Sequence, residues 1–585
     1  MSGSTTLQSA DYVVLVGYFL LMLAIGGYFY RYMKGMKDYF SGGNRIPWWL
    51  SGVSFYMTSF SAFAFVFYSA LAYQYGWVAV TLFWVTIPAT FVSVTFFAAR
   101  WRRARIDSPV EYIETRYSHL LRQIFAWQGV PVKIIDDALK LIATGIFVSV
   151  GLGLDMSQSM FWSGVIILAY TFMGGLWAVA VTDFIQFVVM AAAIMVVFPL
   201  SIAKVGGFSG LVQNAPPGFF RITNPAYSWA YVVSNITLFC ISYSSTAWSL
   251  IQRYYCVPNE REAKKVGWLV ILLYIVTPPL MFVPAMAARQ YLPSLAHTDQ
   301  VYPMLCATLL PAGMLGLIVA AMFSATMSTL SADYNICANV LTNDLYKRLI
   351  RPKASERELV FFGRLMTFIV GIVALGLAFL MARGRGEQQF RNMVTLFSIA
   401  TAPVGLPMIL GLLWKRITNR GAVAGFLIGV AVGLVLFYRF PDETQFLGAT
   451  WKRENVILFG TAVTTLVVII AVSFLLPQPA DEKRRTEAFL KKLSVPIGEM
   501  EEDYEAVRPA GKDVISPFRV VGVTTGLIGI LMLVILPWVG SGMAFKLDLW
   551  IGGGLLIVGS LMTWRSRQPA AARGAGFTRQ SSGGG

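Results

Sequence analysis

The sequence predicts an all-α protein that crosses a membrane many times, and two observations support this. Of the 585 residues, 56% are hydrophobic and only 13% are charged, and the mean hydropathy is +0.63. Apolar runs of about 18 residues or more recur along the chain, and each is long enough to cross the hydrocarbon core as a helix. The runs are continuous rather than alternating, which excludes a transmembrane β-barrel.

About 15 such runs are predicted to span the membrane. They lie near residues 11–32, 47–73, 77–99, 126–152, 158–178, 181–203, 226–250, 266–288, 304–341, 365–382, 393–413, 421–438, 456–476, 519–539 and 547–564. The run at 304–341 is too long for one span, and we expect its C-terminal half to continue out of the membrane.

The basic residues indicate the orientation of the chain. The net charge is +17, and most of the 47 Lys and Arg residues fall in inner loops if the N-terminus lies outside, as the positive-inside rule requires. We therefore predict a bacterial inner (plasma) membrane protein with its N-terminus outside and its C-terminus in the cytoplasm. A basic inner face suits anionic lipids of the bilayer, and nucleic acid is not expected as a partner.

The loops carry no sign of catalysis. The sequence has no GxxxxGK[ST] phosphate loop and no Cys/His metal cluster, so neither ATP-driven transport nor enzyme activity is expected. The longest loop, residues 477–518, is cytoplasmic in this topology. The tail at 565–585 is rich in Gly, Ser, Arg and Ala and is predicted to be disordered.

Polar residues interrupt three of the spans, at residues 57–61, 241–246 and 324–333. Hydroxyls and a carboxylate are unfavourable in hydrocarbon unless they are paired, so the third patch indicates a small-cation site. Five spans separate the first patch from the second, and an odd-numbered helical unit inserts upside down when it is repeated. This pattern is typical of an inverted-repeat transporter with its binding site near the middle of the membrane.

Motifs in a consistent order resemble the sodium/solute symporter family, which includes sodium–sugar, sialic acid and proline symporters. The most specific motif is residues 320–331 followed by 341–347. The other motifs are residues 46–49, 174–183, 251–253, 411–416 and 421–425. The resemblance extends over residues 10–440.

The resemblance implies the LeuT-type fold, in which two inverted five-helix repeats alternate access to a central site. The ten core helices would then occupy residues 46–415, with repeat one at 46–205 and repeat two at 225–415. An extra helix and a cytoplasmic loop would precede them in residues 1–45. About four extra helices would follow in residues 416–564.

The resemblance also implies a sodium ligand set. It consists of the backbone carbonyls of Met57, Phe60 and Ala325 and the hydroxyls of Ser328 and Thr329. Sodium is a hard cation that accepts neutral oxygens, and carbonyls become available where a helix is broken. The alternative is that the two hydroxyls bond to carbonyls one turn earlier in their own helix.

Some family members bind a second sodium through further hydroxyls of this span and an aspartate at the position of Asp183. This chain has Asp183 and Ser331, but Ala332 stands where those members have another hydroxyl. Asp333 supplies the missing oxygen in one interpretation and pairs with a lysine in the other.

The resemblance also identifies candidate residues for binding the solute. They are Thr58, Ser59, Ser61, Phe83, Tyr243 and Tyr274. Ser59, Phe83 and Tyr274 stand where sugar-binding members carry other polar groups, so most sugar-coordinating side chains are absent. Tyr243 matches a gating tyrosine that closes the site from the inner side, although an ordinary core tyrosine is the alternative.

The fourth span carries four charged residues, Lys133, Asp136, Asp137 and Lys140. Their i+3 and i+4 spacings place them on one helix face. Charges within a span must face protein or water. They form either a self-neutralising structural network or a site for a charged or zwitterionic solute, with a lysine meeting a carboxylate and an aspartate meeting an amine or hydroxyls.

These features predict a sodium-coupled secondary active symporter that imports a small polar organic solute by alternating access. A sugar or sugar acid is favoured, followed by a carboxylate or an amino acid. A transporter-like membrane sensor is the alternative from another class. The expected partners are Na⁺, the solute and the lipid bilayer, and a monomer is expected to suffice.

Overall fold

The protein is helical throughout, in agreement with the predicted class. The computed structural model describes residues 9–30, 42–106, 109–171, 176–293, 295–310, 313–382, 386–446, 449–500, 517–539 and 541–566. The predicted tail beyond residue 566 and residues 501–516 of the predicted loop at 477–518 lie outside these ranges.

A first set of five long helical segments follows the peripheral helix α1 (Ser9–Tyr30) and the short η1 (Gly42–Asn44). The set comprises α3–η2–α4 (Trp48–Thr58, Ala64–Tyr68, Ser69–Tyr75), α5–α6–η3–α7 (Val78–Trp84, Thr86–Val92, Ser93–Phe97, Ala98–Arg103), α9 (His119–Leu152), α10 (Met156–Thr171) and α11 (Leu176–Lys204). The short helix α8 (Pro109–Arg116) precedes α9.

A second set of five has the same plan. It comprises α13–η4–α14 (Trp229–Ile241, Ser242–Thr246, Trp248–Tyr255), α15 (Glu260–Tyr291), α17–η6 (Met314–Val340, Leu341–Ile350), α18 (Glu356–Met381) and α19 (Gly386–Leu413). The short helices α12 (Gly207–Gln213), η5 (Thr298–Gln300) and α16 (Val301–Leu309) lie in its connections. Each set begins with a helix that is interrupted part-way, after α3 in the first and around Ala247 in the second. The first two predicted polar interruptions are therefore confirmed as helix breaks.

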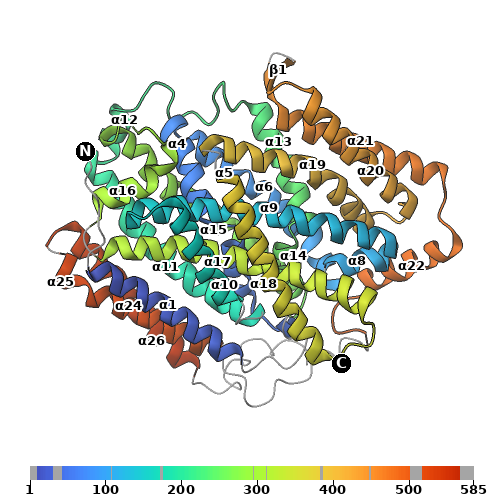
Figure 1. The fold of residues 1–585 in the computed structure, drawn as a ribbon, viewed down its shortest axis with the longest axis horizontal. Helices are drawn as coiled ribbons and strands as arrows, with labels where there is room; N and C mark the ends of the chain where they lie inside the picture. Colours follow the sequence, from blue (N-terminus) through green and yellow to red (C-terminus); the bar gives the residue numbers. More distant parts are fainter. Residues whose placement is uncertain are drawn as a thin grey trace, which may run out of the picture.

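Further elements follow the second set. They are α20 (Asn419–Arg439), β1 (Glu443–Phe446), β2 (Ala449–Lys452), α21 (Arg453–Leu475), α22 (Ala480–Ser494), α24 (Pro517–Val534), α25 (Leu536–Val539) and α26 (Met543–Ser566). The two strands form an antiparallel hairpin that pairs Glu443 with Lys452, and the sequence did not predict it. In Figure 1, α20 and α21 lie together at one end of the molecule, and α1, α24 and α26 lie at the other.

The prediction for residues 304–341 was right in part. The helical chain does continue beyond Leu341, through η6 to Ile350. However, the apolar run does not form one long helix, because α16 ends at Leu309 and α17 begins only at Met314. Gly313 precedes α17 with φ of 87°, a backbone conformation that glycine adopts readily.

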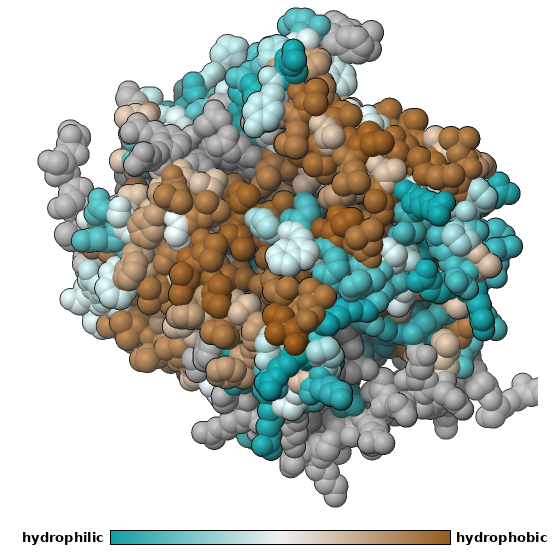
Figure 2. Space-filling model, turned by 45° about the vertical axis from the view of Figure 1, so that its right-hand side comes forward, coloured by the Kyte–Doolittle hydropathy of each residue, from teal (hydrophilic) through white to brown (hydrophobic). Residues whose placement is uncertain are grey.

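The surface agrees with a multi-pass membrane protein. By length and composition, nine of the helices in the described ranges could each cross a membrane, or ten if the bent pair α9–α10 is counted as one span. Figure 2 shows a broad hydrophobic surface bordered by hydrophilic residues. Water-facing helices would not tolerate such a continuous apolar surface, so the bilayer is its natural environment.

Ion pairs join α8, α9 and η6 at one end of the bundle. Arg122 pairs with Glu114 and Asp344, and Arg348 pairs with Glu114. Partial burial opposes ionisation of Glu114, but the hydrogen bonds from the two guanidinium groups outweigh it and lower its pKa. Glu114 is therefore ionised at neutral pH and holds these three elements together.

Helix α17 lies at the centre, and every one of its residues is buried. The peripheral helix α1 packs closely against its first turn, because a Cβ at Gly316 would meet the Asp11 backbone at only 2.5 Å. The Asp11 carboxylate accepts hydrogen bonds from the backbone N–H groups of Gly313 and Gly316, at 2.8 and 2.7 Å. A helix outside the predicted ten-helix core thus caps the central helix.

Replacing Asp11 with Ala is expected to destabilise the protein by about 2 kcal/mol, because two buried N–H groups lose a charged acceptor. The melting temperature of the purified protein in detergent should fall. Tyr12→Phe, at an exposed neighbouring position of α1, serves as the control. Equal melting temperatures for Asp11→Ala and the control would contradict the capping role.

Candidate functional site

The break after α3 presents backbone oxygens to α17. Thr329 Oγ1 lies 2.6 Å from the Phe60 carbonyl oxygen and 3.3 Å from that of Met57. The Ala325 carbonyl oxygen, one turn earlier in α17, is 3.1 Å away. A hydroxyl has one hydrogen to donate, so Thr329 satisfies only one of these three acceptors. The three carbonyl oxygens predicted as sodium ligands therefore lie around Thr329, and two of them receive no hydrogen bond from its hydroxyl.

Ser328 adds a second hydroxyl beside Thr329. Its side chain is fully buried, and its polar neighbour in the described part of the chain is the Asp183 carboxylate. A hydroxyl oxygen that donates to a carboxylate still offers its lone pairs to a cation. In the alternative interpretation, the hydroxyls of Ser328 and Thr329 both bond to carbonyls of their own helix. Only Thr329 makes such a contact, with the Ala325 carbonyl. These neutral oxygens suit a small hard cation such as Na⁺.

Asp183 on α11 is paired with an arginine that the sequence analysis gave no role. Ser54 donates a hydrogen bond to Asp183 Oδ2, and the guanidinium of Arg253 lies 3.6 Å from the same oxygen. Arg253 also bonds to Ser54 Oγ at 2.7 Å and to Thr58 Oγ1 at 3.2 Å. Both charged side chains are fully buried. Asp183 thus already has a cationic neighbour from α14.

The three residues predicted for a second sodium are not all brought together. Ser331 donates a hydrogen bond to the Ser328 carbonyl at 3.1 Å, within its own helix. Asp333 lies with Lys133 and Lys140 of α9 instead, as the salt-bridge interpretation expected. The physical reason is that two buried ammonium groups of α9 lie within 3.0 and 2.8 Å of the Asp333 oxygens and pair with this carboxylate. A second sodium at Asp183 and Ser331 stays a prediction without Asp333.

The predicted charges of α9 form one connected cluster with Asp333. Lys140 Nζ lies 2.7 Å from Asp136, 3.1 Å from Asp137 and 2.8 Å from Asp333. An ammonium has three N–H donors, so these three carboxylates saturate Lys140. Lys133 Nζ lies 3.0 Å from Asp333 and 4.0 Å from Asp136. Lys133 therefore keeps more capacity for a ligand than Lys140.

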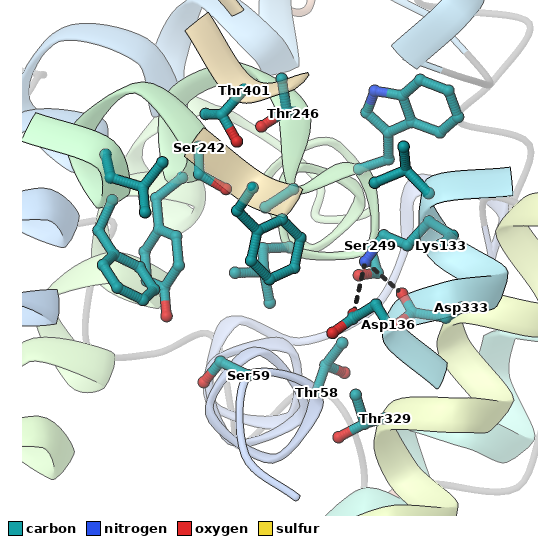
Figure 3. A pocket seen from close by; sticks show the side chains of 18 of the residues that line it. Thr58, Ser59, Lys133, Asp136, Ser242, Thr246, Ser249, Thr329, Asp333 and Thr401 are labelled. Carbon is teal, nitrogen blue, oxygen red and sulfur yellow. Dashed lines mark hydrogen bonds and ion pairs between the residues drawn. The ribbon is translucent and has the colours of Figure 1, made fainter. Parts of the chain in front are cut away.

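A cavity of about 200 Å³ lies between the two helix breaks and this cluster. The predicted residues that line it are Thr58, Ser59, Ser61, Phe83, Lys133, Asp136, Lys140, Tyr243, Thr329 and Asp333. Figure 3 shows Lys133, Asp136 and Asp333 on one side of the cavity and Ser242, Thr246 and Thr401 grouped on another. Thr329 thus belongs both to the predicted sodium ligands and to the wall of the cavity.

Two predicted solute residues lie behind the cavity wall. The Tyr274 hydroxyl donates to Ser59 Oγ and lies 3.3 Å from the Tyr243 hydroxyl, so Tyr274 positions lining residues. Asp137 is completely buried behind Lys140. The gate role of Tyr243 stays a prediction, although its ring does line the cavity beside Phe239.

Other lining residues gave no signal in the sequence. Thr401 and Phe397 come from α19, and Trp248 and Ser249 come from α14. Threonine and aromatic residues are ordinary in apolar helices, so only the tertiary arrangement identifies them. Arg253, which does not line the cavity, entered the sequence analysis only as part of the family motif at residues 251–253.

Aromatic packing closes the cavity on one side. Phe60 packs on Phe65, and Phe83 packs on Tyr68 and Phe282. The opposite walls come from α14, the first half of α9 and α19.

Two inverted helix sets with broken first helices around a central cavity define a class of membrane transporter. A sequence profile described as "Sodium:solute symporter family" matches residues 39–429, so the chain belongs to this family of transporters. The predicted family is confirmed.

Curated relatives agree with this assignment. The sodium/myo-inositol cotransporter 2 of Mus musculus is 28% identical, over 82% of this chain and 78% of its own length. The sodium/sialic acid symporter SiaT of Proteus mirabilis is 26% identical, over 78% and 95% respectively. The sodium/glucose cotransporter of Vibrio parahaemolyticus is 27% identical, over 79% and 91%.

Solved structures show the same fold. A Na⁺-coupled sialic acid symporter in a substrate-bound outward-open state matches with a TM-score of 0.70 at 24% identity, over 80% of this chain and 98% of that one. A nucleobase–cation symport family transporter in a closed conformation matches with a TM-score of 0.52 at 13% identity, over 76% and 97%. The LeuT-type architecture is thus confirmed.

Thr329→Ala is expected to raise the sodium concentration for half-maximal uptake about tenfold, because it removes an oxygen of the ion site. Ser328→Ala should act in the same direction. A sodium titration of solute uptake or of thermal stability measures the effect. Ser324→Ala is the matched control on the same helix, since Ser324 bonds to Tyr18 and Ala320 instead. Unchanged sodium dependence in both variants would remove these hydroxyls from the site.

Lys140→Met is expected to destabilise the protein by about 3–5 kcal/mol, because it leaves three carboxylates with one cation. Lys133→Met should cost less, because Asp333 keeps its contact with Lys140. Melting temperatures and yields of folded protein compare the two. Equal destabilisation would show that both lysines are needed for folding, and that the purely structural interpretation of the cluster is correct.

Proposed function

We propose that the protein is a sodium-coupled secondary active symporter that imports a small polar organic solute by alternating access. The observation that carries this proposal is the convergence of the Met57, Phe60 and Ala325 carbonyls on Thr329, a residue that also lines the cavity. Sodium bound there would join the broken helix to α17 and shape one wall of the solute site. Each ligand then raises the affinity for the other by the same factor.

The proposed orientation places the N-terminus outside and the C-terminus in the cytoplasm of a bacterial inner membrane. The positive-inside distribution of Lys and Arg supports it. In this orientation α9 begins at the cytoplasmic side. One chain holds both the oxygen set and the cavity, and a monomer is therefore sufficient for transport.

The favoured solute is a sugar or sugar acid. Relatives are named for myo-inositol, sialic acid and glucose, and hydroxyl groups of Ser242, Thr246 and Thr401 border the cavity. A carboxylate or amino acid is the second candidate, and Lys133 favours it. Its ammonium borders the cavity, keeps 16% of its side chain exposed and has one close carboxylate partner.

Thermal stability in sodium and in potassium buffer tests the proposal. A ligand that binds only the folded protein raises its melting temperature by mass action. We expect sodium alone to stabilise the protein, and a sugar, sugar acid or amino acid to add to this only when sodium is present. The Thr329→Ala variant should lose the sodium effect. A solute effect that is equal in both buffers would favour a proton-coupled or uncoupled carrier.

A further inference from the structure

A second cavity, of about 420 Å³, lies between the peripheral helices α1 and α24, at the end of the molecule that they share (Figure 1). Each of the two helices contributes five residues to its walls. The floor consists of Val189 of α11 with Leu317 and Ala320 of the central helix α17. Because α1 packs on α17 and α11 while α24 packs on α26 and α11, the two helices form two walls above a shared floor.

The described residues that line this cavity offer almost nothing to a polar ligand. All but one are Gly, Ala, Val, Leu, Ile or Met, and the exception is Tyr18. The Tyr18 hydroxyl is already engaged by α17, since it accepts a hydrogen bond from Ser324 Oγ at 2.8 Å and lies 4.0 Å from Met327 Sδ. A buried water needs about two to four polar partners, so water is not stable here. An apolar occupant is favoured, because an empty space deprives its lining of dispersion contacts.

The cavity opens to the lipid-facing surface. Leu20 of α1 is 61% exposed and Leu527 of α24 is 44% exposed, and both line the cavity. Helix α24 lies along α26, which is long and apolar enough to cross a membrane, and a Cβ at Gly529 of α24 would meet the Gly552 carbonyl of α26 at 2.6 Å. The mouth of the cavity therefore lies at the depth of the hydrocarbon core, where acyl chains surround the protein.

The size of the cavity separates an acyl chain from a helix of another protein. A helix with its side chains is about 10–12 Å wide, so two turns of it would take up about 800 Å³ or more, about twice the volume of the cavity. An acyl chain is a single file of methylene groups and fits a narrow space. The cavity also reaches the backbone of α1, because the nearest atom to a Cβ built at Gly17 is Leu531 Cδ1, at 3.9 Å. Shape and chemistry both favour a chain of the surrounding bilayer.

We propose that an acyl chain of a membrane phospholipid occupies this cavity and holds α1 against α17. The chain lies beside Leu317 and Ala320 of α17 and the ring of Tyr18, so it supports the contact between Tyr18 and Ser324. Ser324 precedes Ser328 of the candidate ion site by one helical turn. Loss of the chain leaves a void between the two helices, and a void lowers stability in proportion to its size. The phospholipid is thus a structural ligand of the helix that carries the ion site.

Photolabelling of the purified protein in liposomes of phosphatidylethanolamine and phosphatidylglycerol tests the proposal. A trace of phosphatidylcholine carries a diazirine on one acyl chain, and mass spectrometry locates the labelled residues. Residues 527–535 should be labelled more heavily than the lipid-facing surface of α18, because a chain held in a cavity dissociates more slowly. Gly17→Leu fills the cavity and should reduce this labelling about tenfold. Gly376→Leu on α18 is the control, since a Cβ there meets nothing within 4 Å.

Labelling of residues 527–535 that only equals that of α18, or that Gly17→Leu leaves unchanged, would overturn the proposal. Unlabelled residues 527–535 in a protein that elutes as a dimer would assign the cavity to a second copy of the chain, and would overturn it too.

Thermal stability gives a second measurement, which does not depend on the folding of Gly17→Leu. The wild-type protein, stripped of lipid in detergent, should regain about 2 °C or more of melting temperature when dioleoyl phosphatidylglycerol is added. Dihexanoyl phosphatidylglycerol has the same head group but chains too short to fill the cavity, and it should have little effect. Gly17→Leu should respond less than the wild type to the long-chain lipid, and Gly376→Leu should respond equally. Equal effects of the two lipids on the wild type would show that the head group is recognised, and would overturn the proposal.

Discussion

Helix α17 is buried along its whole length, so each polar group that it carries needs a partner inside the protein. Ser324 Oγ forms a hydrogen bond with the Tyr18 hydroxyl of α1, at 2.8 Å. Thr326 meets Thr144 of α9 at 2.7 Å, and Asp333 meets the two lysines of the same helix. These partners belong to different helices, so the polar side chains of α17 fix its place among its neighbours more specifically than apolar packing alone would.

The break in the first core helix depends on the same side chains. An interrupted helix leaves N–H and carbonyl groups without intrahelical partners, and these cannot turn to lipid. The Ala62 N–H donates to Thr326 Oγ1 at 3.2 Å, and the Phe60 carbonyl accepts from Thr329 at 2.6 Å. Helix α17 thus satisfies donors and acceptors of the unwound segment. Neighbouring hydroxyls stabilise this irregular backbone. Its carbonyl oxygens therefore stay free of helical hydrogen bonds and could bind an ion.

The sequence predicted what depends on composition and spacing along one helix. Long apolar runs identified the helices, and the family motif predicted that Thr329 lies beside the Met57, Phe60 and Ala325 carbonyls. Spacing along α9 also predicted that Lys140 would contact Asp136 and Asp137. It could not choose the partner of Asp333, because a carboxylate on the face of Thr329 can turn to α3, α9 or α11. Contacts between helices decide that, as they decide the pairing of Asp183 with Arg253 and the contribution of Thr401 to the cavity.

The position of Asp333 connects the cavity to the ion site through a single helix. Thr329 and Asp333 lie one turn apart on α17, the first beside the broken helix and the second held by Lys133 and Lys140. If the solute binds among these charges, as proposed, it changes the pairing of Asp333 directly, one turn from the residue that faces the broken helix. The energetic coupling between solute and ion therefore needs no long chain of intermediates. It requires only that α17 be rigid over one turn, which its complete burial and its packing against α1, α9, α11 and α18, among other helices, favour.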